Sequence, residues 1–269
     1  MLDEDAFDRA LAMDADRALT ILADLTAATD RRLAALARRI AGRLVLDIAR
    51  GGRAAGRGVG RLVSVPAGRS DGDLDVEASI DAIQLSRVTA TPPTIDDLRV
   101  RTWRRASMAV CLLVDRSGSM HGNRLMSACV TAAGCAWRAP ADFSVVAFAD
   151  DAWVLKSLHG HRSTDGLVHD LLRLRGHGVT NLSLGLETAC SQLEQSNARR
   201  RVTILLSDCR QTAGDDPTVA ARALDELAIF APRDDCDDAK TFAASAGARL
   251  VTVASPFDAP AALARALDR

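Results

Sequence analysis

Three oxygen-bearing side chains at alternate positions are the part of this sequence best suited to chemistry. Asp115, Ser117 and Ser119 follow the apolar run at residues 110–114, and Gly118 separates the two serines. A tight turn at a glycine can aim one carboxylate and two hydroxyls at a common point. Hard oxygen donors with one negative charge suit Mg²⁺ or Mn²⁺ better than Zn²⁺, which prefers thiolate or imidazole, or Ca²⁺, which collects more carboxylates. The spacing therefore predicts a divalent metal site.

The segment Asp115-Arg116-Ser117-Gly118-Ser119 resembles the Asp-x-Ser-x-Ser signature of von Willebrand factor A (VWA) domains. In that family a metal-ion-dependent adhesion site (MIDAS) is built from three loops, with a threonine on the second loop and an aspartate on the third. Thr180, within the stretch 176–181, is similar to the threonine. Asp208, which follows the apolar run at 204–206, is similar to the aspartate.

The resemblance also implies a role for each of these side chains. Ser117 and Ser119 would bind the ion directly, and Thr180 directly or through water. Asp115 and Asp208 would act mainly through water. One coordination position would remain open, and in the family it commonly accepts a carboxylate from a partner protein.

Three positions near these loops depart from the family pattern. Val179 and Cys209 stand where the family often has glycine, and Arg210 follows Cys209. The five oxygen donors are unaffected, but the backbone of the loops is expected to differ. We also expect Arg210 to bring a positive charge beside the ion, which weakens metal binding or favours an acidic ligand.

The pattern of apolar runs after Arg105 predicts alternating strands and helices. The predicted strands are 108–114, 143–149, 153–155 at an edge, 202–206 and 249–253, and the predicted helices are 125–137, 165–174, 182–195, 217–230, 238–246 and one from 259. This order indicates an α/β fold with a doubly wound, mainly parallel, Rossmann-like sheet and helices on both faces. Ligands of such sheets bind at the carboxyl ends of strands, where Asp115, Thr180 and Asp208 would converge.

A purely structural explanation exists for each piece of the site. Asp115, Ser117 and Ser119 could form a capping turn before the next helix, and Asp208 could cap the loop after its strand. That explanation does not account for the occurrence of all the pieces at the same end of the sheet. We therefore favour the metal site.

The first part of the chain has a different character. Residues 5–50 are rich in alanine, leucine and arginine and predict helix. Residues 60–65 predict a short strand, 76–85 one or two helical turns, and 98–104 an extended segment. We therefore divide the chain into a smaller, mainly helical N-terminal region, 1–104, and a VWA domain, 105–269.

Two stretches of the N-terminal region imitate ligand-binding motifs. Residues 51–61 combine glycine with arginine but have no aromatic residue for base stacking and no dinucleotide fingerprint, so we expect no nucleic-acid binding. The acidic residues of 71–75 lack the remaining ligands of a calcium loop, so helix capping by Asp73 or Asp75 is the better interpretation.

Composition limits the other classes of protein. The 269 residues are 48% hydrophobic with a formal net charge of −1, which gives no bias toward nucleic acid or membrane. No run approaches the roughly 18 apolar residues that cross a bilayer, and the first residues are acidic, so we expect a cytoplasmic protein. The six cysteines form no C-x-x-C pair, and the five histidines form no recognisable zinc set, which indicates unpaired cysteines and surface histidines.

These observations favour a protein-binding adaptor over an enzyme. The sequence has neither a P-loop nor a G-x-S-x-G nucleophile motif. It looks like the MoxR-associated and CoxE-like VWA proteins, which implies a Mg²⁺ site that captures a glutamate or aspartate of a partner and a MoxR-type AAA+ ATPase as co-worker. The alternative is a metal-dependent hydrolase or chelatase-type subunit that uses the same ion. A third reading is a scaffold with an empty metal site.

Overall fold

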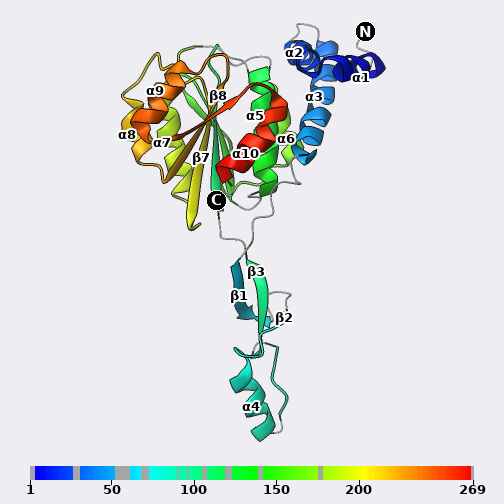
Figure 1. Ribbon diagram of the computed structural model, residues 1–269, viewed down its shortest axis with the longest axis vertical. Helices are drawn as coiled ribbons and strands as arrows, with labels where there is room; N and C mark the ends of the chain where they lie inside the picture. The colour runs from blue at the N-terminus through cyan, green and yellow to red at the C-terminus, as the bar shows by residue number, and fades with distance from the viewer. Residues whose placement is uncertain are drawn as a thin grey trace. The chain divides into compact units, whose positions relative to one another are not determined.

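The computed structural model forms two compact units, residues 1–56 with 108–269 and residues 57–107 (Figure 1). The structure describes residues 4–26, 31–51, 61–67, 73–89, 91–95, 97–104, 108–118, 123–138, 142–174 and 178–267. Each unit is taken by itself below.

The larger unit is built on a six-stranded sheet. Its strands are β4 (Met108–Asp115), β5 (Phe143–Phe148), β6 (Ala152–Lys156), β7 (Arg200–Leu206), β8 (Glu226–Pro232) and β9 (Arg249–Val253). They lie in the order β6-β5-β4-β7-β8-β9, and all neighbours are parallel except β5 and β6. This arrangement confirms the predicted α/β class and the edge strand near residues 153–155. β4 lies inside the sheet, so its carboxyl end is flanked by those of β5 and β7.

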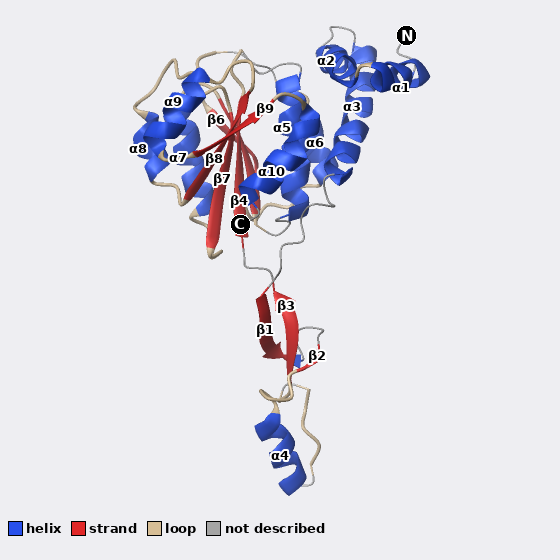
Figure 2. Cartoon of the chain, viewed as in Figure 1, coloured by secondary structure: helices blue, strands red, loops and turns tan. Residues whose placement is uncertain are grey.

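Helices cover both faces of this sheet, as predicted. Alternate side chains of β4 enter two separate cores, one with Val110 and Leu112 and the other with Cys111 and Leu113. Figure 2 shows the two helical layers, which are α5 (Asn123–Arg138), α6 (Thr164–Leu171) and α10 (Ala259–Leu267), after the short η3 (Pro256–Asp258), on one face, and α7 (Leu182–Leu193), α8 (Pro217–Arg222) and α9 (Asp237–Ala246) on the other.

Three N-terminal helices belong to the larger unit. They are α1 (Glu4–Met13), α2 (Ala15–Thr26) and α3 (Arg31–Gly51). Leu19, Leu22, Ile40 and Val45 of α2 and α3 are buried in the same core as Val110 of β4. The predicted N-terminal region, 1–104, is therefore divided in the structure, because α1, α2 and α3 belong to the larger unit and residues 57–107 form a unit of their own.

One predicted helix is wrong in its second half. The stretch 217–230 was expected to be helical, but α8 ends at Arg222 and β8 begins at Glu226. Leu227 to Ala231 are buried, so β8 is an internal strand that lacks the polar and apolar alternation of a half-buried strand.

The smaller unit is an antiparallel sheet with one helix. It contains β1 (Arg61–Pro66), β2 (Asp73–Leu74), α4 (Ile80–Thr89) and β3 (Arg99–Arg104). Asp75 is buried, accepts a hydrogen bond from the Ala78 amide in the turn before α4, and pairs with Arg101. All ten residues of α4 are described, and none of them is buried.

Membrane-spanning helices and disulfide bonds are both absent from the described residues. No helix in the described ranges has the length and apolar character needed to cross a membrane. The six cysteines, all within the described ranges, form no disulfide with one another, and five of them are buried.

Candidate metal centre

Asp115 ends β4 and is completely buried. Its Oδ1 accepts a hydrogen bond from the Ser117 amide at 2.7 Å, and its Oδ2 accepts one from the Ser207 hydroxyl at 2.6 Å. The first bond closes a turn that brings the chain back over the strand end. Asp115 therefore fixes the shape of the first loop and joins it to the end of β7. Ser117 is buried next to it, whereas Ser119 lies outside the described residues.

Asp208 lies in the loop that follows β7, beside Asp115. It is buried, and its Oδ1 accepts a hydrogen bond from the Arg210 amide at 3.0 Å. Burial raises the pKa of the Asp115 carboxyl above its usual value; hydrogen bonds from Ser207 and Ser117 oppose the rise, and the negative charge of Asp208 adds to it. The two carboxylates therefore share one poorly solvated region and repel each other.

A divalent cation fits this donor set. Two close carboxylates and a serine hydroxyl are hard oxygen ligands, and a cation would relieve the repulsion between Asp115 and Asp208. Within the part of the chain that the structure describes, no three histidine, cysteine, aspartate or glutamate side chains cluster as a metal site. The hydroxyl groups that the sequence pattern predicts as ligands are therefore needed to complete a site here.

Thr180 is buried at the start of the segment that leads into α7. Its amide donates a hydrogen bond to the Thr212 hydroxyl at 2.8 Å, and its carbonyl accepts hydrogen bonds from the amides of Thr212 and Ala213. Thr212 lies four residues after Asp208 in the same loop. Among the described residues, Thr180 is thus joined to the aspartates through this loop rather than by a direct hydrogen bond.

Backbone hydrogen bonds hold the loops together at the carboxyl end of the sheet. The Arg116 amide donates to the carbonyl of Phe148 at the end of β5, and the Asn181 amide donates to the next carbonyl, that of Ala149, each at 2.8 Å. The end of β5 therefore bridges the loop of Ser117 and the loop of Thr180. The structure places Asp115, Ser117, Thr180 and Asp208 on loops of the same sheet edge.

Cys209 has an unusual backbone conformation. Its φ is +60°, and it is the only non-glycine residue with positive φ among those described. This is the position where the VWA pattern often has glycine, so the loop has the left-handed shape without the residue that favours it. The Cys209 side chain is buried, and its amide donates to the Ser207 hydroxyl at 2.8 Å. A cysteine therefore occupies a backbone conformation that glycine adopts more readily.

Arg116, the variable residue of the Asp-x-Ser-x-Ser segment, braces the first loop. Its guanidinium is buried, pairs with Asp151, lies 3.8 Å from Asp150 and stacks 3.9 Å from the centre of the Trp153 ring. Asp151 and Trp153 belong to the turn and edge strand after β5. The motif alone does not mark Arg116 as important, because its partners lie in the segment that follows β5.

Arg124 is the cation that reaches the candidate metal centre. Its Nη1 lies 3.5 Å from Oδ2 of Asp208, and its Nη2 lies 3.3 Å from Oδ2 of Asp235. Arg210, the residue expected to bring positive charge beside the ion, pairs with Asp235 at 2.9 Å and Asp238 at 3.2 Å, and the negative charge of Asp208 also helps to raise its pKa. No sequence motif marks Arg124, which lies seven residues after Ser117 in the first turn of α5.

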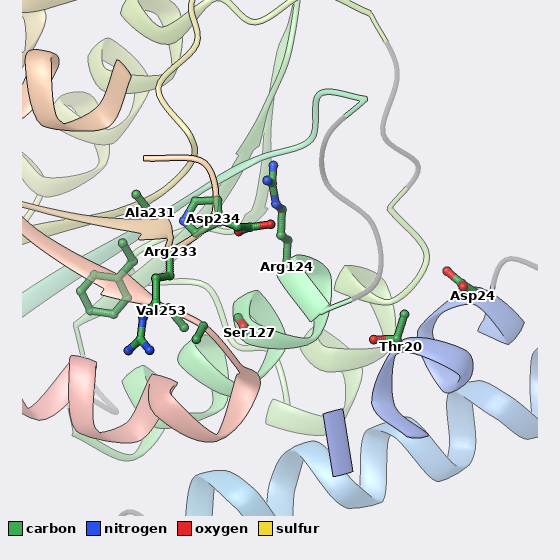
Figure 3. A pocket seen from close by; sticks show the side chains of 11 residues that line it. Thr20, Asp24, Arg124, Ser127, Ala231, Arg233, Asp234 and Val253 are labelled. Carbon is green, nitrogen blue, oxygen red and sulfur yellow. The ribbon is translucent and has the colours of Figure 1, made fainter. Parts of the chain in front are cut away.

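A pocket of about 680 Å³ lies beside this arginine, at the carboxyl ends of β8 and β9 (Figure 3). Its walls come from α2, α5 and the two strand ends, and it is lined by Thr20, Asp24, Arg124, Ser127, Phe230, Ala231, Pro232, Arg233, Asp234, Val253 and Ala254. Arg124 therefore belongs both to this pocket and to the surroundings of Asp208.

The histidines contribute little to the described site. His159, His161 and His169 are exposed, which confirms their assignment to the surface. His121 and His177 lie outside the described residues.

The chain matches the model of one protein family, described as VWA domain containing CoxE-like protein, over residues 20–235. The matched range includes α3, the smaller unit and every candidate metal ligand. No curated protein matches the chain.

Solved structures with VWA domains resemble the larger part of the chain. A von Willebrand factor type A structure from Catenulispora acidiphila is 16% identical with a TM-score of 0.47, covering 61% of this chain and 43% of that one. BatB from Bacteroides thetaiotaomicron is 15% identical with a TM-score of 0.49, covering 60% of this chain and 97% of that one. This chain thus spans less than half of the first of these proteins.

Proposed function

Because this chain belongs to the family of CoxE-like VWA domain proteins, we propose that it is a protein-binding adaptor with a Mg²⁺ or Mn²⁺ site. In this proposal the site captures a glutamate or aspartate side chain of a partner protein. The observation that supports it best is the pairing of two buried carboxylates, Asp115 and Asp208, beside Ser117 at the carboxyl edge of the sheet.

Each side chain of the site has a distinct part in the proposal. Ser117 and Ser119 offer hydroxyl oxygens to the ion, and Thr180 offers a third from the neighbouring loop. Both oxygens of Asp115 already accept hydrogen bonds, so this residue acts mainly by orienting the Ser117 loop and by supplying negative charge. Asp208 supplies the second negative charge.

The bound ion would supply a Lewis-acidic position for one more anionic oxygen. Few formal charges surround it, so a carboxylate from outside completes the shell favourably. The protein partner would accordingly present an exposed acidic side chain. The neighbouring arginines, Arg124 and Arg210, add positive potential that attracts such a group.

The energy for any remodelling of the partner would come from elsewhere. The sequence has no P-loop, since neither Lys156 nor Lys240 follows a glycine. This chain resembles the VWA proteins that are associated with MoxR-type AAA+ ATPases, so we propose such an ATPase as its partner. In this arrangement the ATPase hydrolyses ATP and this chain contacts the target.

Titration with Mn²⁺ followed by paramagnetic resonance tests the metal part of the proposal. The parent protein is expected to bind one Mn²⁺ that Mg²⁺ displaces, and the Ser117→Ala and Asp208→Asn variants are expected to lose that binding. Ser191→Ala is the matched control, because Ser191 is an exposed hydroxyl on α7, away from the metal loops. Unchanged binding by folded Ser117→Ala and Asp208→Asn proteins contradicts the proposal.

Affinity purification from the native cells tests the partner. We expect a AAA+ ATPase to be retained by the parent protein and released by EDTA. Retention that persists in EDTA, or that is equal for the Ser117→Ala variant, contradicts capture through the ion.

A further inference from the structure

Arg124 touches a buried carboxylate of the candidate metal centre and also lines a pocket. Its side chain is 23% exposed, whereas that of Asp208 is 4% exposed. One guanidinium therefore spans Asp208 on one side and Asp235, in the loop after β8, on the other.

A guanidinium in this place competes with a divalent cation. Both are attracted to the same carboxylate, and in a poorly solvated site two cations at short separation repel each other strongly. Arg124 thus neutralises part of the charge of Asp208 when no cation is present. Binding of a cation at the site therefore requires the ion pair between Arg124 and Asp208 to break.

Arg124 has a second carboxylate partner besides Asp208. Asp235 already holds its Nη2, and the pocket extends from Arg124 toward the strand ends. In Figure 3 the Arg124 side chain extends from the first turn of α5. Because Asp235 already pairs with Nη2, Arg124 keeps one carboxylate partner when it leaves Asp208.

The character of the pocket indicates what would hold Arg124 there. Arg124 and Arg233 are its two positive residues, and Arg233 is exposed. Asp24 and Asp234 also line the pocket and are likewise exposed, while the buried Ser127 contributes a hydroxyl. The two aspartates balance the two arginines, so the feature that favours a carboxylate is the Arg124 guanidinium itself, which can pair with one when it leaves Asp208.

We propose that Arg124 is a tethered competitor of the cation, and that the pocket is a second subsite for an acidic side chain of the partner. This inference rests on the proposed function and describes how cation binding at the proposed site is regulated. A carboxylate in the pocket holds Arg124 away from Asp208 and so raises the affinity for the cation. By linkage, a bound cation releases Arg124 and raises the affinity of the pocket for a carboxylate by the same factor.

Arg210 provides a matched control. Its guanidinium pairs with the same Asp235, but not with Asp208. Arg210→Gln and Arg124→Gln each remove one positive charge near the site, so a general electrostatic effect changes Mn²⁺ affinity in both variants. A competitor effect changes it chiefly in Arg124→Gln.

The test uses Mn²⁺ alone with the full chain. Arg124→Gln is expected to bind Mn²⁺ at least about fivefold more tightly than the parent, within the usual range of coupling between sites. Asp235→Asn, which removes the second carboxylate partner of Arg124, is expected to bind it less tightly. Circular dichroism and thermal unfolding show that each variant is folded. If Arg124→Gln does not fold, Asp235→Asn is compared with Asp238→Asn, which removes an equal charge and a partner of Arg210 but no partner of Arg124; equal Mn²⁺ affinities of these two variants overturn the competitor role.

The pocket is tested by placing a carboxylate in it. Ala254 lines the pocket and is exposed, so Ala254→Glu imitates the partner's side chain and Ala254→Gln serves as its neutral control. Ala254→Glu is expected to raise Mn²⁺ affinity in the parent background but not in the Arg124→Gln background. An equal effect in both backgrounds, or no effect, overturns the subsite.

The remaining outcomes separate this inference from the proposed function. If the parent binds Mn²⁺ through Ser117 and folded Arg124→Gln binds it no more tightly, the competitor role is overturned and the metal site stands. If neither protein shows Mn²⁺ binding that depends on Ser117, the proposed function itself fails.

Discussion

The Ser207 hydroxyl donates a hydrogen bond of 2.6 Å to the Asp115 carboxylate, across the carboxyl ends of the neighbouring strands β4 and β7. The same hydroxyl oxygen accepts a hydrogen bond from the Cys209 amide at 2.8 Å. Ser207 therefore connects the first metal loop to the left-handed turn of the third. No sequence motif draws attention to this serine, yet it fixes the separation of the two aspartates.

Replacing Ser207 by alanine should destabilise the metal-free protein. The change leaves the buried Asp115 carboxylate and the Cys209 amide each with one partner fewer, and such losses typically cost about 1–3 kcal/mol of unfolding free energy. Urea denaturation in EDTA measures the difference. Ser191→Ala, at an exposed helix position, should stay within about 0.5 kcal/mol of the parent. Equal midpoints for Ser207→Ala and Ser191→Ala would show that the bridge is not important.

Asp115 should make stability depend on pH in a definite direction. Its pKa is raised, chiefly by burial, so the folded state binds this proton more tightly than the unfolded state does. The contribution of protonated Asp115 to the free energy of unfolding is fully present below the ordinary aspartate pKa. It is lost as the pH rises through the raised pKa of Asp115 in the folded state. Asp115→Asn should therefore be more stable than the parent near neutral pH in EDTA. The advantage should shrink as the solution is acidified.

Asp151 supplies a control of opposite sign for that measurement. Burial acts to raise its pKa, but hydrogen bonds from Arg116 and Trp153 hold it below the usual value. Asp151→Asn should therefore lose stability relative to the parent at neutral pH and approach it in acid. If both variants change stability in the same direction, the assigned pKa shifts are wrong.

Gly214 should not tolerate a side chain. Its φ is +89°, and a Cβ there would collide with the Asn181 side chain, which caps α7 by accepting a hydrogen bond from the Leu184 amide. Gly214→Ala should therefore displace the segment of Thr180, lower Mn²⁺ affinity and cost about 1–3 kcal/mol of stability. The measurements are Mn²⁺ titration and urea denaturation.

Gly42 of α3 is the matched control for the change at Gly214. A Cβ at this position would meet nothing within 4 Å, and alanine favours helix. Gly42→Ala should therefore raise stability by about 1 kcal/mol and leave Mn²⁺ affinity unchanged. A Gly214→Ala protein as stable as the parent would contradict the close packing of the two loops.

The sequence predicted the sheet well where strands are long and β-branched. The run before Asp115 and that before Asp208 were recognised as buried strands because valine, isoleucine and leucine follow one another without charge. The stretch Glu226–Pro232 was missed because its glutamate, leucine and two alanines favour helix locally, and burial on both faces removes the alternation that marks a strand.

That missed strand explains why part of the site was not foreseen. Asp235 and the pocket-lining residues 230–234 follow from the position of β8 in the sheet, and a helix would have placed them elsewhere. No motif includes Arg124, because its importance arises only from its ion pair with Asp208. The oxygen donors, in contrast, were predictable from their spacing, although their shared ligation of one ion stays a prediction.

The most direct measurement is the anomalous scattering of Mn²⁺ in crystals of the full chain. We predict one strong peak bounded by the side chains of Ser117, Ser119 and Thr180, with Asp115 and Asp208 behind it. No peak among these side chains in a crystal saturated with Mn²⁺, or a peak that persists there unchanged in Ser117→Ala, would contradict the metal-dependent capture of a partner.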